Sequence, residues 1–182
     1  MKNILANLEY IKDLAWSEVF EIWRADEEGS AAWEAHWRER GFDSWEEWRE
    51  RYVGPLKLRE RGWKLYRVIE PAKTVPLWRG GPFKSWVEKF YDGEAAPAFE
   101  ELMKKPELRE HDGLRRMAKD FPKETTVSAV MTDDGIVVVE GMHRCCAVTL
   151  GAAEGRDVAK SFYLALGDHL PGELEVVGRF KK

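Results

Sequence analysis

The chain contains one short stretch in which a strand pattern turns directly into a helix pattern. Residues 136–140 (Ile-Val-Val-Val-Glu) are typical of a buried strand, and the apolar run at 145–150 is typical of a helix, with Gly141 between them. Such a junction presents unpaired backbone N–H groups and the positive end of a helix dipole at one point. It therefore predicts an α+β fold with a site for an anion, above all a phosphate.

Each residue of the junction suits a phosphate site. Gly141 allows a sharp turn and a close approach of the ligand, and the N–H groups after it, from Met142 on, point outward. Arg144 can form a bidentate pair with phosphate oxygens, and His143 can donate to a phosphate or transfer a proton. Glu140 is a candidate catalytic base or metal ligand, but it can equally pair with Arg144 and do nothing more.

Composition places the chain among globular proteins. It has 182 residues and 44% hydrophobic content, enough for one sizeable core. No stretch approaches the roughly 20 apolar residues that span a bilayer, and the start lacks the apolar core of a signal peptide. The adjacent Cys145 and Cys146 are the only cysteines, which excludes a disulfide framework and a cysteine metal cluster. We expect a cytoplasmic protein with free thiols, no membrane contact and no metal centre.

The charge of the chain argues against nucleic acid as a partner. The chain carries 29 basic and 33 acidic side chains, for a net charge of −4. Nonspecific nucleic-acid binding draws on many Lys and Arg contacts to phosphates. Here the basic residues form only short groups such as Arg115-Arg116 and Lys181-Lys182. A local basic patch stays open as an alternative.

The first 62 residues differ in composition from the rest of the chain. All nine tryptophans precede residue 87, and six of them lie within the first 50 residues. Tryptophan at helical spacing usually packs against a neighbouring element, here the second part of the chain. A stacking platform for bases or sugars is the alternative, because Trp and Arg alternate at Trp37-Arg38 and Trp48-Arg49. We expect a helical N-terminal subdomain at 1–62 and a second domain at 63–182.

Three helices are expected in this front segment. Apolar residues at three- and four-residue steps predict an amphipathic helix over 4–23. Ser30 can cap a second helix, which contains Trp33 and Trp37. Ser44 can cap a third helix, and Glu47, three residues later, completes the pattern of a capping box.

The second domain is expected to contain both strands and helices. Expected strands lie at 63–70, 127–131, 136–140, 160–166 and 174–180, and expected helices lie at 83–91, 97–104 and 107–121. The turn Asp133-Asp134-Gly135 joins two of these strands into a hairpin, whose second strand leads into the Gly141 junction.

The motif Gly-x-His-Arg, followed by two residues and an alanine, occurs at 141–147. With the hairpin before it and a helix ending near a glycine after it, the region 63–167 resembles the ParB/sulfiredoxin superfamily. The resemblance implies a ParB/sulfiredoxin-like mixed sheet with packed helices, here preceded by the Trp-rich segment. In that superfamily the motif lies at a helix N-terminus and holds nucleotide phosphates. It implies that Gly141, His143 and Arg144 bind the phosphates of ATP or ADP, with CTP as the alternative and Mg²⁺ as a companion.

Two departures narrow the choice of relative. Sulfiredoxin has its catalytic cysteine directly before His-Arg, where this chain has Met142, so thiol chemistry is not expected. A chromosome-partitioning ParB brings a helix-turn-helix domain after the motif domain, and only about 30 residues follow Ala152. A small-molecule kinase or a nucleotide hydrolase fits better.

An enzyme of either kind needs a carboxylate for the acceptor hydroxyl or for Mg²⁺. Glu70 and Glu140 are the main candidates, since Asp133 and Asp134 more often only make a turn. Arg79, in the loop Arg79-Gly80-Gly81, is a candidate for a second phosphate contact, although a loop between a strand and a helix needs glycines in any case.

The leading functional hypothesis is a nucleotide-binding protein that acts as a phosphotransferase or nucleotide hydrolase on a small-molecule substrate. The first alternative is a noncatalytic regulatory module whose Trp-rich helices bind a partner protein, which the lack of a clear catalytic carboxylate would favour. The second alternative is a DNA-associated ParB-like protein, which the mild acidity of the chain disfavours.

Overall fold

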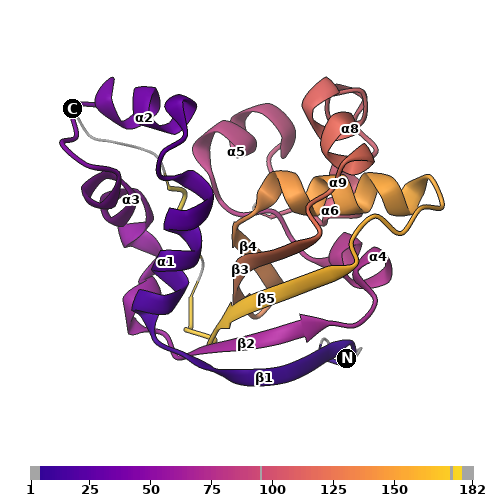
Figure 1. The fold of residues 1–182 in the computed structure, drawn as a ribbon, viewed down its shortest axis with the longest axis horizontal. Helices are drawn as coiled ribbons and strands as arrows, with labels where there is room; N and C mark the ends of the chain where they lie inside the picture. Colours follow the sequence, from indigo (N-terminus) through magenta and orange to yellow (C-terminus); the bar gives the residue numbers. More distant parts are fainter. Residues whose placement is uncertain (1–4, 95, 173, 178–182) are drawn as a thin grey trace.

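A five-stranded mixed sheet forms the centre of the molecule (Figure 1). The computed structural model describes residues 5–94, 96–172 and 174–177. Its strands are β1 (Leu8–Leu14), β2 (Trp63–Val68), β3 (Glu124–Thr132), β4 (Gly135–Glu140) and β5 (Ser161–Gly167), in the order β1-β2-β5-β3-β4. β5 and β3 are parallel, and the other neighbours are antiparallel. The expected mixed sheet with packed helices is confirmed.

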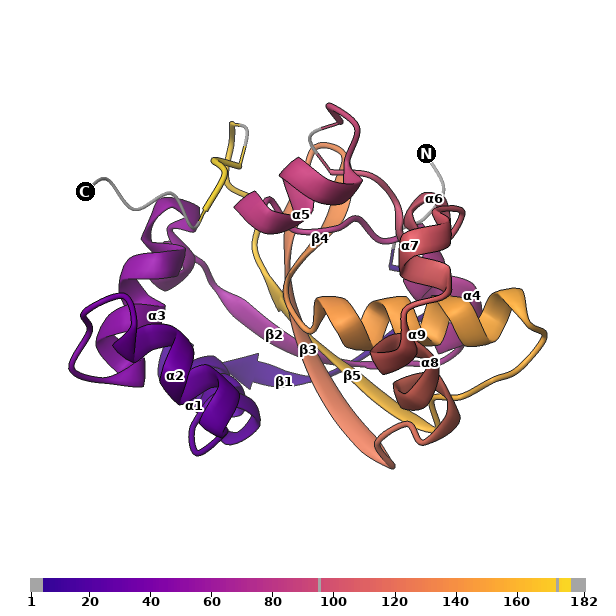
Figure 2. The ribbon, with the colours of Figure 1, turned by 90° about the horizontal axis from the view of Figure 1, so that it is seen from above.

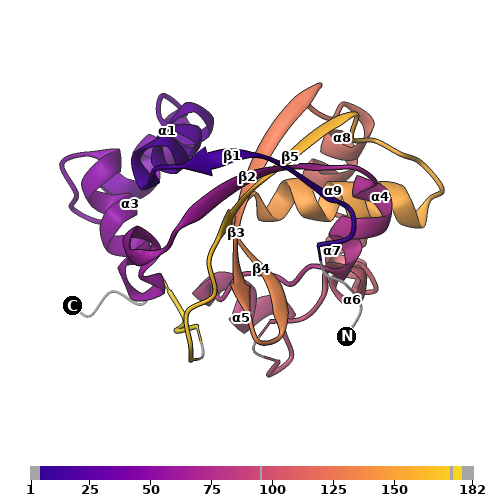
Figure 3. The same cartoon turned by 90° about the horizontal axis from the view of Figure 1, so that it is seen from below.

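The helices form two groups. They are α1 (Trp16–Glu27), α2 (Ala31–Arg38), α3 (Trp45–Val53), α4 (Pro71–Thr74), α5 (Lys84–Phe90), α6 (Phe99–Leu102), α7 (Pro106–Arg109), α8 (Asp112–Lys119) and α9 (Met142–Ala153). α4, α6 and α8 contact α9, whereas α1–α3 stand together on the opposite side of the molecule (Figures 2 and 3). Across the described ranges, every helix is too short or too polar to traverse a bilayer.

Strand β4 is buried along its whole length although it is the last strand of the sheet. The backbone of Arg79 supplies the missing partner: its N–H donates to the carbonyl of Ile136, and its carbonyl accepts from the N–H of Val138, both at 2.9 Å. Buried backbone groups need such partners. The strand can therefore be apolar throughout, and it ends with Glu140 in the interior of the protein.

The helix expected over 4–23 is wrong in its first part. Residues 8–14 form β1, which pairs with β2 from Leu8 opposite Val68 to Leu14 opposite Trp63, and the helix begins at Trp16. A register shift between Tyr10 and Lys12 breaks the two-residue alternation that identifies a strand in a sequence. The apolar spacing of a bulged edge strand thus resembled that of a helix, and pairing with β2 decided the outcome.

The two other helices of the front segment are confirmed. Ser44 caps α3, because its hydroxyl accepts a hydrogen bond from the N–H of Glu47 at 3.1 Å. The reciprocal half of the capping box is shifted by one residue, since the Glu47 carboxylate accepts from the N–H of Asp43 instead of Ser44. Ser30 occupies the cap position of α2 without a side-chain hydrogen bond.

Three expectations for the second domain need correction. The helix expected at 107–121 is divided into α7 and α8, because the His111 ring accepts from the N–H of Leu114 and caps a new helix there. The helix expected at 97–104 is reduced to α6. In the strand expected at 174–180, residues 174–176 are irregular and Val177 forms a single bridge with Phe83; residues 178–180 lie outside the described ranges.

The front segment and the second domain share the sheet. β1 belongs to residues 1–62 and forms an edge strand beside β2. The division of the chain at residue 62 stays a prediction.

Candidate functional site

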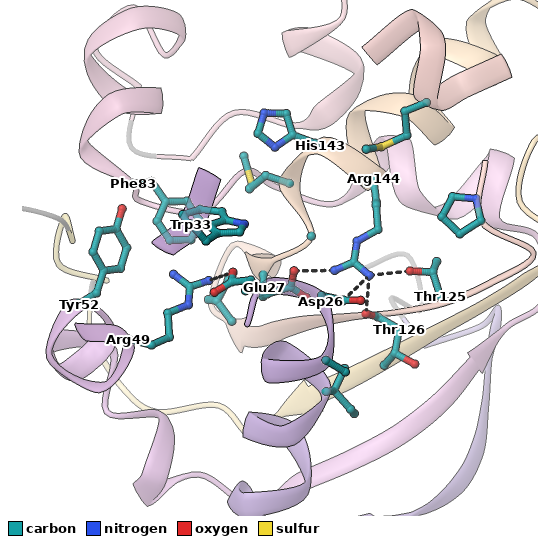
Figure 4. A pocket seen from close by; sticks show the side chains of 18 of the residues that line it. Asp26, Glu27, Trp33, Arg49, Tyr52, Phe83, Thr125, Thr126, His143 and Arg144 are labelled. Carbon is teal, nitrogen blue, oxygen red and sulfur yellow. Dashed lines mark hydrogen bonds and ion pairs between the residues drawn. The ribbon is translucent and has the colours of Figure 1, made fainter. Parts of the chain in front are cut away.

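A cavity of about 700 Å³ opens between the front helices and the rest of the protein (Figure 4). One wall comes from the end of α1 and from α2 and α3. The opposite wall comes from α5, the start of β3, the end of β4 and the start of α9. The Trp-rich segment therefore contributes directly to the space into which the Gly141 junction opens.

Gly141 starts α9 in a conformation that other residues rarely adopt. Its φ angle is +96°, and a Cβ atom placed on it would lie 2.4 Å from Cγ1 of Val127. The first hydrogen bond within the helix runs from the N–H of Cys145 to the carbonyl of Gly141, so the three N–H groups of 142–144 lie ahead of the helical pattern. This glycine thus produces the amino end of a twelve-residue helix at the cavity wall, as the sequence predicted.

Arg144 is held by protein acceptors. Its guanidinium donates to the hydroxyl of Thr125 at 2.6 Å and to the carbonyl of Thr126 at 3.0 Å. It also forms ion pairs with Asp26 at 2.9 Å and with Glu140 at 2.5 Å. The side chain that the sequence predicted as a phosphate ligand therefore already has two carboxylate partners, one from α1 and one from the end of β4. Figure 4 shows the pair with Asp26.

Glu140 is a buried carboxyl group at the cavity wall. Only 7% of the residue is exposed, and one oxygen pairs with Arg144 while the other, Oε2, has no hydrogen-bond partner in the described structure. Burial raises its pKa, and Arg144 acts in the opposite direction. Glu140 therefore lies at the cavity wall with one oxygen on Arg144 and the other available for a further hydrogen bond.

His143 faces the cavity with an accessible ring. Trp86 lies edge-on to it, with 5.4 Å between the ring centres. Partial burial against the cavity wall lowers the pKa of His143, and the positive charge of a protonated His111 nearby lowers it further. The neutral ring is therefore favoured near pH 7. A neutral imidazole can accept a proton or donate one hydrogen bond.

A second buried ion pair, which sequence reasoning missed, lies across the cavity. Arg49 of α3 pairs with Glu27 of α1 at 2.8 Å, and the indole N–H of Trp45 donates to the same carboxylate at 2.9 Å. The guanidinium carbon lies 4.8 Å from the ring centre of Trp23 and 5.3 Å from that of Trp48. Burial raises the pKa of Glu27, which Arg49 opposes.

Aromatic rings form the wall contributed by α2, α3 and α5. Trp33 and Trp48 have ring centres 5.5 Å apart, and Tyr52 stacks on Phe83 at 6.1 Å with an angle of 22°. These rings therefore pack against one another and make this wall of the cavity aromatic.

Unpaired buried polar atoms concentrate at this cavity. In the described ranges, four buried side-chain N or O atoms lack a hydrogen-bond partner: Arg24 Nε, Trp48 Nε1, Arg49 Nε and Glu140 Oε2. The last three belong to residues that line the cavity. A buried polar group left without any partner costs roughly 1–3 kcal/mol, so these atoms are expected to bind ordered water or a ligand in the cavity.

Two residues predicted for the site lie elsewhere. Glu70 pairs with Lys73 at the start of α4, and it does not line the cavity. Arg79 donates to the carbonyls of Asp134 at 2.8 Å and Ala96 at 2.7 Å, so its guanidinium fastens the loop to the β3–β4 hairpin. The sequence showed which chemistry Glu70 and Arg79 could perform. Whether they reach the start of α9 depends on tertiary packing, which the sequence pattern did not reveal.

The two cysteines are buried in α9. Both thiols have no exposed surface, and burial raises the pKa of each. Both are free thiols, as expected, and both pack in the hydrophobic core.

We therefore expect that Cys145 and Cys146 in the folded protein react far more slowly with an aromatic disulfide reagent than the same thiols in denaturant. Absorbance of the released thiolate measures both rates. Equal rates in the two conditions would contradict the burial of the pair.

No metal centre is formed by the part of the chain that is described: no three His, Cys, Asp or Glu side chains gather so as to hold a metal ion. No protein-family model, curated protein or solved structure gives a significant match to this chain.

Proposed function

We propose that the chain binds a nucleotide in the cavity, with its phosphates at the amino end of α9 and its base among the aromatic rings of α2, α3 and α5. The observation that carries the proposal is the opening of that helix end, set by left-handed Gly141, into an aromatic-lined cavity of about 700 Å³. Helix N-termini bind phosphate through backbone N–H groups and the helix dipole. A cavity of this size accommodates a small organic ligand.

The phosphate contacts in this proposal come from the backbone and from His143. The N–H groups of 142–144 are ahead of the helical hydrogen-bond pattern, and the His143 ring is accessible from the cavity. Arg144 contributes positive charge beside the helix end, although its guanidinium also pairs with Glu140 and Asp26. The resemblance of 63–167 to the ParB/sulfiredoxin superfamily supports the same assignment, and we propose that fold for this region.

The chemistry that fits these residues is phosphoryl transfer to a hydroxyl or to water. The neutral His143 can take the proton of the attacking hydroxyl as its oxygen bonds to the terminal phosphorus and the bond to the leaving phosphate breaks. Glu140 is the second candidate for proton transfer. In this proposal ATP or ADP is the nucleotide, CTP is the alternative, and Mg²⁺ arrives with the phosphates.

The partner-protein alternative finds less support in the front segment. None of the nine tryptophans is exposed; those of the front helices pack against one another and against the sheet, as Trp23 does by donating to the hydroxyl of Ser128 at 2.7 Å. The first role of these tryptophans is therefore to hold α1–α3 against the sheet and to line the cavity.

Calorimetric titration with ATP, ADP, CTP and GTP, each with Mg²⁺, tests the proposal. We expect at least one nucleotide to bind, and His143→Ala to weaken its binding about tenfold, the effect of one lost hydrogen bond to a charged group. His169→Ala is the matched control, because His169 pairs with Asp133 and does not line the cavity. The proposal is wrong if no nucleotide binds the native chain, or if His143→Ala binds as tightly as the control.

A further inference from the structure

Asp26 is the accessible partner of Arg144. It lies next to the last residue of α1, and its carboxylate is 2.9 Å from the guanidinium. The Asp26 side chain is 44% exposed, whereas that of Glu140, the other carboxylate on Arg144, is 7% exposed. Of the two carboxylates, Asp26 is the one that a ligand in the cavity can reach and replace.

The two ion pairs of Arg144 also differ in how readily they can be given up. Asp26 is the half-exposed member of its pair with Arg144, and water screens this pair more than it screens the buried pair of Arg144 with Glu140. Loss of the pair with Glu140 would instead leave the buried guanidinium of Arg144 without its close partner, which is strongly destabilising. A phosphate that displaced Asp26 would therefore break the weaker of the two ion pairs of Arg144, and it would gain charge-assisted hydrogen bonds to Arg144 and to the N–H groups of α9.

We propose that Asp26 is an internal competitor for the phosphate site. Its carboxylate pairs with Arg144 at the cavity wall, so a phosphate must displace it or bind beside its negative charge, and either route weakens binding. This inference rests on the proposed function, and it assigns to Asp26 control over the affinity for phosphate-bearing ligands. An acidic side chain in the site thus opposes binding of the ligand instead of assisting it.

The inference predicts a gain of affinity from the loss of an acid. Asp26→Asn keeps the shape of the side chain, and Arg144 keeps its pair with Glu140. We expect Asp26→Asn to bind ADP and inorganic pyrophosphate about tenfold more tightly than the native chain, since a factor of ten corresponds to about 1.4 kcal/mol of removed competition. Adenosine has no phosphate, so its affinity should stay unchanged.

Calorimetric titration of the native chain, Asp26→Asn and Glu21→Gln with these three ligands separates the outcomes. Glu21 lies on the same helix and its replacement removes the same charge, but it does not line the cavity. If ADP binds the native chain and Asp26→Asn binds it equally or more weakly, the competitor role is overturned while nucleotide binding stands. The same holds if Glu21→Gln tightens binding as much. If ADP, the other nucleotides and pyrophosphate bind neither protein, the proposed function fails, and the inference fails with it.

Discussion

Replacing Arg49 by methionine is expected to lower the free energy of unfolding by about 3 kcal/mol at neutral pH, because it leaves the Glu27 carboxylate buried without its cation. Methionine keeps much of the volume that packs between Trp23 and Trp48. The loss is therefore mainly electrostatic. Denaturant unfolding, followed by tryptophan fluorescence, measures it.

The pH dependence of this loss identifies its cause. Without Arg49, the pKa of Glu27 rises further above its value of 4.5 in the unfolded chain. A raised pKa in the folded state contributes stability below the unfolded pKa, and that stability is lost as pH rises through the folded pKa. The Arg49→Met defect should thus be smaller at about pH 5 than at about pH 8.

The double variant Glu27→Gln/Arg49→Met is the control for this prediction. It removes the Glu27 charge that the single variant leaves without a partner, while the glutamine still accepts the hydrogen bond of the Trp45 indole. We expect it to be more stable than Arg49→Met alone at neutral pH. A double variant that is no more stable, or a defect that does not change with pH, would contradict the electrostatic explanation.

Replacing Gly141 by alanine is expected to destabilise the protein by about 3 kcal/mol. A non-glycine residue at φ +96° costs roughly 1–2 kcal/mol, and the overlap of its Cβ with Val127 adds roughly 1–3 kcal/mol in a packed core. The start of α9 would move, so binding of the nucleotide should weaken as well. Chemical denaturation and titration with ADP measure the two effects.

Gly155→Ala is the matched control for Gly141→Ala. Gly155 also has a positive φ, +72°, but a Cβ there meets nothing within 4 Å. Its replacement should therefore cost only the backbone part, about 1 kcal/mol, and should leave nucleotide binding unchanged. Equal losses at the two positions would mean that the contact with Val127 has no role.

The residues of the site differ in how well local sequence could identify them. Gly141 and His143 belong to a contiguous motif, and the change from strand to helix around them is visible in the sequence. Asp26 and Arg49 carry no such signal, because they reach the cavity only when the tertiary fold places α1 and α3 across it from the end of β4 and the start of α9. Glu27 has a weak sequence signal, because it follows Trp23 by four residues and so shares the buried face of α1.

The error in the first helix has a related cause. The segment 8–14 has the apolar spacing of a helix because its strand contains an irregularity between Tyr10 and Lys12. Edge strands depend on a neighbour far away in the sequence for their hydrogen bonds, here β2, roughly fifty to sixty residues later. Local periodicity does not reveal that neighbour.

Local sequence alone determined β4, the left-handed turn at Gly141 and the amino end of α9. These features depend on neighbouring residues: the apolar run makes the strand, the missing Cβ permits the turn, and the segment after it forms the helix. Tertiary structure alone decided that Asp26 joins Glu140 on Arg144, and that Trp-rich helices line the cavity. The pair of Asp26 with Arg144 and the two walls of the cavity join residues more than a hundred positions apart, and their distances are set by packing of the whole fold.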